Sequence, residues 1–207
     1  MQKVIIMLGF PASGKGTQAN ILAKRLGYNY FGTGDLLRAE VEKGSELGKT
    51  FAKLMDVGEL VPDNLTDPLV KKKLGSLKGS GVILDGYPRN LNQVQVLKQV
   101  FPDEDFLVLN IEVSAEALLK RMQNRRICEK CGKIYTINPG ENRKCDICGG
   151  NLIQRADDSP EVLARRITTY EELTSPIIRY YQNKGVLVTI NGEPPIPEVT
   201  KEIEKVV

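Results

Sequence analysis

One short stretch near the amino terminus constrains the fold more than any other part of the sequence. Residues 9–17 read Gly-Phe-Pro-Ala-Ser-Gly-Lys-Gly-Thr and lie between an apolar run at 4–8 and a helical pattern at 19–26. This is the spacing of a phosphate-binding loop, in which backbone N–H groups and a helix N-terminus surround phosphate oxygens. The bland alternative is an ordinary glycine-rich strand–helix turn with a chance lysine. Because the strand and helix flank the loop correctly, the sequence predicts a P-loop α/β domain.

The composition is that of a soluble globular protein and excludes several classes of function. The chain has 207 residues, of which 41% are hydrophobic and 27% charged, and its net charge is +3. That mild charge, with basic residues scattered along the chain, does not suggest a nucleic-acid binder. No run approaches the ~20 apolar residues of a membrane span, so we expect a cytoplasmic protein. Histidine is absent, which excludes histidine acid–base chemistry and histidine metal sites.

Short apolar runs alternate with helical patterns along the whole chain. The predicted strands are residues 4–8, 28–31, 82–85, 106–111 and 186–190. This order implies a five-stranded parallel sheet with helices on both faces. Residues 32–61 have no strand and read as two short helices, the second capped by Ser45, so we expect a helical insertion. A later helix either begins at Asp67 or is kinked at Pro68, and Pro176 either kinks another helix or starts a new one.

The four cysteines form two closely spaced pairs in a segment with little core material. Cys128 and Cys131 are followed after thirteen residues by Cys145 and Cys148. Two such pairs can supply a tetrahedral set of four thiolates, which suits a structural Zn²⁺. Two disulfides, four unrelated thiols or iron in the same site remain alternatives. A zinc ribbon of this kind would also fit a nucleic-acid or protein-binding module.

The residues after the third predicted strand discriminate between two kinds of phosphate chemistry. Asp85 ends that strand and is followed by Gly-Tyr-Pro-Arg, so Arg89 stands where a hydrolase commonly has a water-activating group. Phosphoryl transfer to an anionic acceptor needs positioning and positive charge rather than a general base. Other arginines lie near element ends; each alone reads as a surface charge, but with the loop they suggest a second phosphorylated substrate.

These motifs together resemble the adenylate kinase family, in its long-lid, zinc-binding bacterial type. The resemblance covers nearly the whole chain and includes the late Thr17, the Thr33-Gly34-Asp35 turn, and the two ends of the cysteine segment. It implies reversible transfer of a phosphoryl group from MgATP to AMP, giving two ADP. It also implies a core at 1–31, 62–126 and 156–207, an AMP-binding insertion at 32–61, and a zinc-stapled lid at 127–155. We expect a monomer with no nucleic-acid or membrane partner.

The resemblance assigns roles residue by residue. The ATP-binding residues are Gly9, Pro11, Ala12, Ser13, Gly14, Lys15, Gly16, Thr17, Arg121 and Arg125. The AMP-binding residues are Thr33, Gly34, Arg38, Val61, Gly86, Arg89, Gln93, Arg155 and Arg166. The residues assigned to catalysis are Lys15, Arg89, Arg125, Arg155, Arg166, Asp157 and Asp158, with the two aspartates orienting the arginines. Thr17 and Asp85 help to place Mg²⁺, Asp85 through water.

Three positions bear on how closely this chain follows the family pattern. Ala12 stands where a third loop glycine is usual, and we expect little effect because a negative φ would tolerate its methyl group. Gly32 stands where serine is common, which would loosen the insertion without removing a phosphate contact. Thr33 favours AMP over UMP or CMP, since the pyrimidine relatives usually carry alanine there. A kinase for another nucleoside monophosphate is therefore the nearest alternative.

Overall fold

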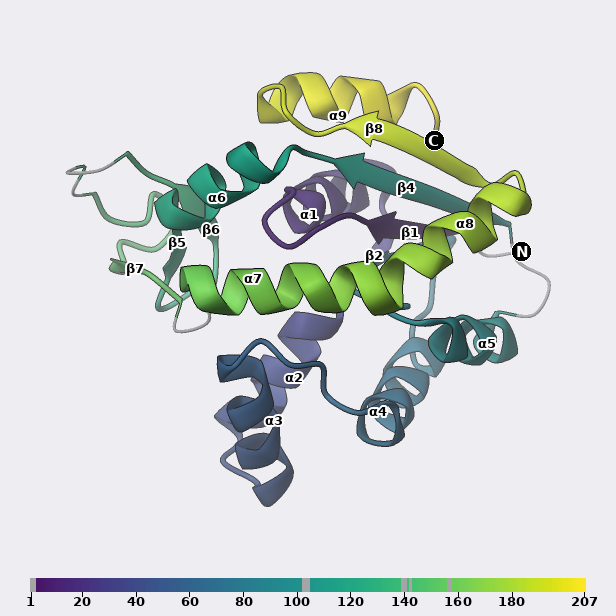
Figure 1. The fold of residues 1–207 in the computed structure, drawn as a ribbon, viewed down its shortest axis with the longest axis horizontal. Coiled ribbons are helices and arrows are strands. Elements are labelled where there is room, and N and C mark those ends of the chain that lie inside the picture. Colours follow the sequence, from purple (N-terminus) through teal and green to yellow (C-terminus); the bar gives the residue numbers. More distant parts are fainter. Residues whose placement is uncertain (1–2, 102–104, 139–140, 142, 156–157) are drawn as a thin grey trace.

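The computed structural model, which describes residues 3–101, 105–138, 141, 143–155 and 158–207, is built on one parallel sheet (Figure 1). Its strands are β1 (Lys3–Leu8), β2 (Asn29–Gly32), β3 (Gly81–Asp85), β4 (Phe106–Glu112) and β8 (Leu187–Asn191). They lie in the order β2-β3-β1-β4-β8, and every neighbouring pair is parallel. The predicted five-stranded parallel sheet is confirmed. The central position of β1 places the loop that follows it in the middle of the carboxyl-terminal edge.

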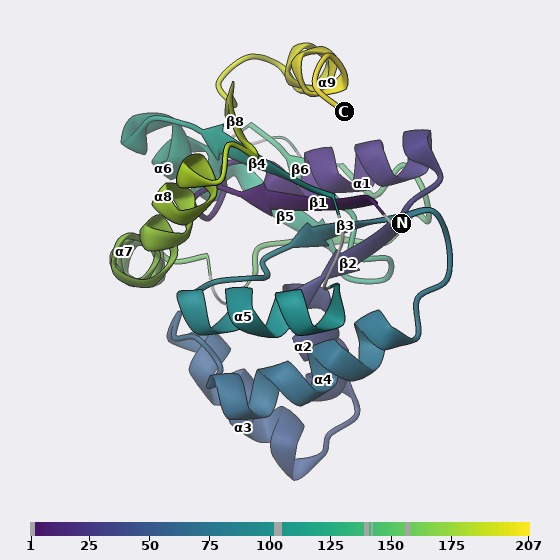
Figure 2. The same ribbon diagram turned by 90° about the vertical axis from the view of Figure 1, so that its right-hand side faces the viewer.

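Helices cover both faces of this sheet (Figure 2). Ile5 and Met7 pack toward α1 (Lys15–Leu26) and α9 (Ile196–Glu204). Val4 and Ile6, which point the other way, pack toward α4 (Asp63–Gly75), α5 (Leu91–Val100) and α8 (Ser175–Asn183). The apolar runs are continuous because a parallel strand between two helical layers is buried on both faces.

The helical insertion projects from one end of the sheet (Figure 1). It contains α2 (Thr33–Glu42) and α3 (Glu46–Asp56), which pack together around Leu37, Phe51 and Val61. Ser45 caps α3 as predicted, since its side chain accepts a hydrogen bond from the N–H of Gly48. Leu65 and Leu69 of α4 also pack against this cluster, which joins the insertion to the helical layer of the sheet.

The two proline ambiguities resolve differently. The α4 helix begins at Asp63, so the predicted start at Asp67 is wrong and Pro68 lies inside the helix. Near Pro176, α7 (Pro160–Thr169) continues through a π-helical turn, η1 (Tyr170–Thr174), into α8. Pro176 lies in the first turn of α8, where a missing N–H costs little.

The cysteine segment follows α6 (Ala115–Asn124) and contains strands that the sequence analysis did not predict. They are β5 (Arg125–Cys128), β6 (Ile134–Thr136) and β7 (Leu152–Ile153), paired antiparallel in the order β6-β5-β7. The buried cluster here consists of Cys128, Tyr135, Ile137 and Cys145, with Leu152 packed against it. So small a cluster needs a cross-link to hold its shape. Across the part of the chain that the structure describes, no helix is both long and apolar enough to cross a bilayer.

Candidate active site

The phosphate-binding loop joins β1 to α1 and requires glycine at two of its positions. Gly9 and Gly14 have φ values of 144° and 97°. A Cβ at Gly9 would also lie 2.7 Å from both the Ile111 carbonyl oxygen and Ser13 Oγ. The loop turns tightly, with the Ser13 N–H donating to the Phe10 carbonyl at 3.1 Å. This backbone brings the amides of the loop and the N-terminus of α1 to one point, as a phosphate site needs.

Ala12 corrects one expectation. Its φ is +67°, and it is the one non-glycine residue with positive φ among those described. The expected tolerance rested on a negative φ, and that premise is wrong. A left-handed conformation costs an L-residue about 1–2 kcal/mol, so the methyl group of Ala12 puts strain into the loop.

Lys15 is half-buried near Asp85, at the end of β3. Its Nζ donates to the Phe10 carbonyl oxygen at 3.2 Å. The pKa of Lys15 is lowered to about 8, chiefly by desolvation; Asp85 opposes this shift, and nearby Arg89, Arg125 and Arg166 add to it. The charged form of an amine in such a site is stabilised when an anion binds, and the phosphates of a nucleotide would supply that anion.

A close contact at Gly16 bears on why the hydroxyl residue of the loop, Thr17, comes one position later than usual. A Cβ at Gly16 would lie 2.7 Å from Asp85 Oδ2. A serine or threonine directly after Lys15 would therefore require this carboxylate to move. Thr17 lies one residue further along α1, and with Asp85 it offers oxygen ligands of the type that Mg²⁺ prefers.

A small pocket lies between the insertion and the loop after β3. It is lined by Thr33, Leu37, Leu60, Val61, Thr66, Gly86, Arg89 and Gln93. Five of these are residues assigned to AMP from the sequence. The Thr33 hydroxyl is buried there with no hydrogen-bond partner among the described residues. A buried orphaned hydroxyl costs free energy unless a ligand or water satisfies it, so it marks a polar ligand site.

Arg89 is held rigidly at the wall of this pocket. Its Nε donates to the Gly86 carbonyl at 2.8 Å, and its backbone N–H donates to Gln93 Oε1 at 2.8 Å. Thr174, in the π-helical turn, donates to the Arg89 carbonyl at 2.8 Å. Burial first, and Arg166 second, lower the pKa of Arg89 to about 10, so the guanidinium stays charged at neutral pH.

Arg38 and Arg121 lie beside this pocket and the phosphate loop, respectively. Arg38 Nη2 donates to Asp35 Oδ1 at 2.6 Å on α2, and a Cβ at Gly34 would lie 3.0 Å from the same nitrogen. Arg121 reaches the phosphate loop, donating to the Ser13 carbonyl at 2.9 Å.

Arg125, Arg155 and Asp158 lie at the two ends of the cysteine segment, and Arg166 lies on α7. Arg125 Nε donates to Asp158 Oδ2 at 2.8 Å, and a second contact makes the pair bidentate. Arg155 is half-buried at the end of the segment. Asp157 lies outside the described residues.

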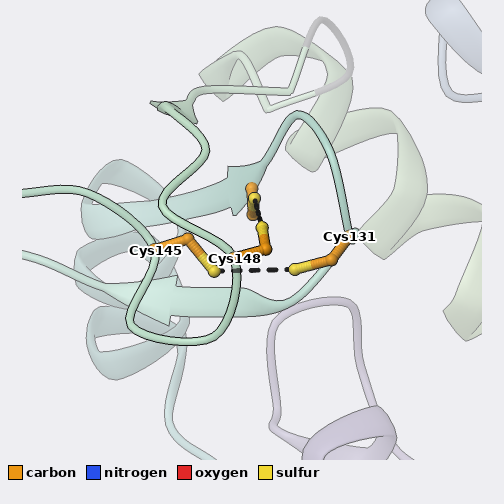
Figure 3. A group of neighbouring side chains, drawn as sticks. Cys131, Cys145 and Cys148 are labelled. Atoms are coloured by element: carbon orange, nitrogen blue, oxygen red, sulfur yellow. Dashed lines mark hydrogen bonds between the residues drawn. The ribbon is translucent and has the colours of Figure 1, made fainter.

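The four cysteine sulfurs converge within the small sheet. Figure 3 shows Cys145 facing Cys131 at 3.5 Å, and Cys128 lies 3.4 Å from Cys148. All four Sγ atoms lie within 4.8 Å of one another. Four sulfurs at ~2.3 Å from one Zn²⁺ would be spaced by roughly 3.8 Å, so this donor set fits a closed tetrahedral site. All four cysteines are free thiols, which argues against the disulfide alternative.

Comparison with known proteins agrees with this geometry. The family model for adenylate kinase matches residues 7–186. The chain belongs to the adenylate kinase family. An adenylate kinase of Petrotoga mobilis is 44% identical over 96% of this chain and 94% of its own length. Those of Caldicellulosiruptor saccharolyticus and Staphylococcus epidermidis are 44% and 42% identical, each over at least 96% of both chains. Membership of this family makes the chain an enzyme, a nucleoside monophosphate kinase.

Sequence reasoning missed two aromatic residues of the site. Tyr170 in η1 stacks on Phe10 of the loop, with ring centroids 4.4 Å apart. Tyr30 on β2 places its hydroxyl between Asp85 and Asp35. Tyr30 reads as an ordinary apolar strand residue, and only the pairing of β2 with β3 reveals its neighbours.

Proposed function

We propose that this enzyme transfers a phosphoryl group reversibly between MgATP and AMP, giving two ADP. The observation that carries the proposal is the cluster of Lys15, Arg89, Arg125 and Arg166, which are close enough to perturb the Lys15 pKa together. So many half-buried cations in one place are unfavourable alone and become favourable around several phosphates. A single nucleotide on the loop would not require the second cation group at Arg89.

The donor nucleotide is assigned to the loop at residues 9–17 and to Arg121, whose guanidinium already contacts the loop. Lys15 neutralises charge on the outer phosphates. Mg²⁺, when bound with ATP, would neutralise phosphate charge and align the transferring group, and Thr17 and Asp85 would hold it. Arg125, which Asp158 orients, is assigned to the transferring phosphate.

The acceptor is assigned to the pocket lined by Thr33, Val61, Gly86 and Gln93, with its phosphate on Arg38 and Arg89. Its phosphate is already ionised, so no residue needs to remove a proton. Arg155 and Arg166 lie on the lid side and stabilise charge during transfer. Preference for AMP over UMP and CMP is attributed to Thr33, whose buried hydroxyl awaits a polar partner.

The insertion at 32–61 and the lid at 127–155 are proposed to close over the two nucleotides and exclude water. Without that exclusion the same cations would promote hydrolysis of ATP. Zn²⁺ on Cys128, Cys131, Cys145 and Cys148 would hold the lid's shape without taking part in transfer, because the four thiolates leave no open position. We propose a cytoplasmic monomer that acts without nucleic acid or membrane.

The test mixes the purified enzyme with Mg²⁺, ATP and one nucleoside monophosphate at a time, and measures ADP. We expect rapid ADP formation with AMP and slow ADP release with no acceptor. Faster turnover with UMP, CMP or GMP would keep the transfer chemistry and overturn the assignment of the acceptor. ADP release at one rate whichever acceptor is present would refute the two-substrate site.

A further inference from the structure

The Tyr30 hydroxyl occupies an unusual position between two carboxylates. Its Oη lies 3.2 Å from Asp85 Oδ2 and 3.1 Å from Asp35 Oδ2. Tyr30 lies on β2 beside Ile83 of β3, so the strand pairing fixes the ring. A phenol has one proton and donates one hydrogen bond at a time. The proton is therefore shared between a carboxylate at the sheet edge and one on the helical insertion.

Gly32 makes room for this hydroxyl. A Cβ at Gly32 would lie 2.5 Å from Tyr30 Oη and 2.7 Å from Asp35 Oδ2. The backbone gives no other reason for glycine, because φ and ψ at Gly32 are −107° and 116°, an extended conformation open to any residue. Serine would cap α2 slightly better than glycine does. Gly32 is thus explained by the space that the tyrosine hydroxyl needs, rather than by looseness of the insertion.

The two carboxylates belong to different halves of the site. Asp85 faces Gly16 and Lys15, on the side assigned to MgATP. Asp35 pairs through its other oxygen with Arg38 at 2.6 Å, on the side assigned to the AMP phosphate. Asp35 and Arg38 are both partly exposed, so their pair alone would orient Arg38 only weakly. The Tyr30 hydroxyl, held by the sheet, adds a hydrogen bond to Asp35 and so orients the pair more strongly.

We propose that Tyr30 is a positioning residue that fixes Arg38, through Asp35, in register with Asp85 and the phosphate loop. This inference rests on the proposed function, because it gives Arg38 the acceptor phosphate as its ligand. Tyr30 touches neither nucleotide in this scheme. It orders the acceptor-side arginine before AMP binds, which lowers the entropy lost on binding.

Tyr30→Phe removes the hydroxyl and keeps the ring. We expect the KM for AMP to rise about tenfold, the size of effect expected for one lost hydrogen bond to a charged group, with the KM for MgATP within about twofold. Tyr28→Phe makes the same chemical change two residues earlier and should leave both constants unchanged. Gly32→Ala should raise the KM for AMP as Tyr30→Phe does, because its methyl group displaces the hydroxyl.

The double variant Tyr30→Phe with Gly32→Ala separates positioning from a general loss of packing. If both changes act through one hydroxyl, the double variant should match the single variants within about twofold. An unchanged KM for AMP in Tyr30→Phe, equal rises in both KM values, or multiplied effects in the double variant would overturn the inference. Wild-type enzyme that makes no ADP from MgATP and AMP would instead refute the proposed function itself, and the inference with it.

Discussion

The ion pair between Arg125 and Asp158 supports a quantitative prediction. The pair is bidentate, and the two side chains are 13% and 0% exposed. Asp158→Asn keeps the shape of the side chain and removes its charge, so the largely buried guanidinium loses the one carboxylate that pairs with it among the described residues. Breaking a buried pair from one side costs about 3–5 kcal/mol. For a chain of this size each kcal/mol lowers Tm by about 2–4 °C, so we expect Tm to fall by roughly 10 °C.

The chain offers a matched control for this variant. Arg25 pairs with Glu204 at the surface, where the side chains are 54% and 37% exposed. Glu204→Gln makes the same carboxylate-to-amide change, and an exposed pair contributes about 0–1 kcal/mol, so Tm should fall by less than about 4 °C. Differential scanning calorimetry of both variants without nucleotide measures the two shifts. Equal shifts, or a more stable Asp158→Asn protein, would refute the argument from burial.

Three further predictions follow from the site and the lid. Replacing Cys128 and Cys131 by serine should remove bound zinc, which a chelating dye measures. It should also lower Tm far more than it lowers turnover at low temperature. Lost turnover in a folded protein would contradict a structural role for the metal. The pKa of Lys15 is about 8 without ligand, so the amine is about half protonated at pH 8. Bound phosphate raises this pKa, and ATP binding at pH 8 should therefore take up about half a proton. Calorimetry in buffers of different ionisation enthalpy measures the uptake, which Lys15→Met should abolish. Ala12→Gly should stabilise the protein by about 0.5–1 kcal/mol in urea unfolding, since relief of strain exceeds the added chain entropy; destabilisation would show that the left-handed φ is not strained.

The sheet could be predicted because its strands are continuous apolar runs bounded by loops. The cysteine segment gave no such signal. Its strands β6 and β7 have three and two residues, too short for any periodicity to appear. Their pairing with β5 depends on the two cysteine turns. In these turns the Gly132 N–H donates to the Cys128 carbonyl oxygen, and the Gly149 N–H donates to the Cys145 carbonyl oxygen. The spacing of the cysteines predicted the site, and the sheet follows from it.

The backbone of the phosphate loop could not be predicted residue by residue. The spacing predicted glycine at positions 9 and 14, where φ is positive, and Lys15, whose Nζ donates to the Phe10 carbonyl oxygen within the loop. The sign of φ at Ala12 depends on how the turn from Phe10 to Ser13 closes, and alanine carries no signal for a left-handed conformation. The error at Ala12 is therefore one of local geometry, and the motif that surrounds it is unaffected.

The glycines at positions 16 and 32, where the usual motif has a hydroxyl residue, each lie beside a side chain from a strand of the sheet. The sequence around each glycine does not reveal that neighbour. A side chain at position 16 would need the Asp85 carboxylate, at the end of β3, to move, and Gly16 leaves that carboxylate in place. Gly32 leaves space in the same way for Tyr30 of β2. Both neighbours become adjacent through the pairing of parallel strands, whose carboxyl ends meet at one edge of the sheet. A glycine at such an edge can mark what lies beside it in space, even where its own backbone conformation is open to any residue.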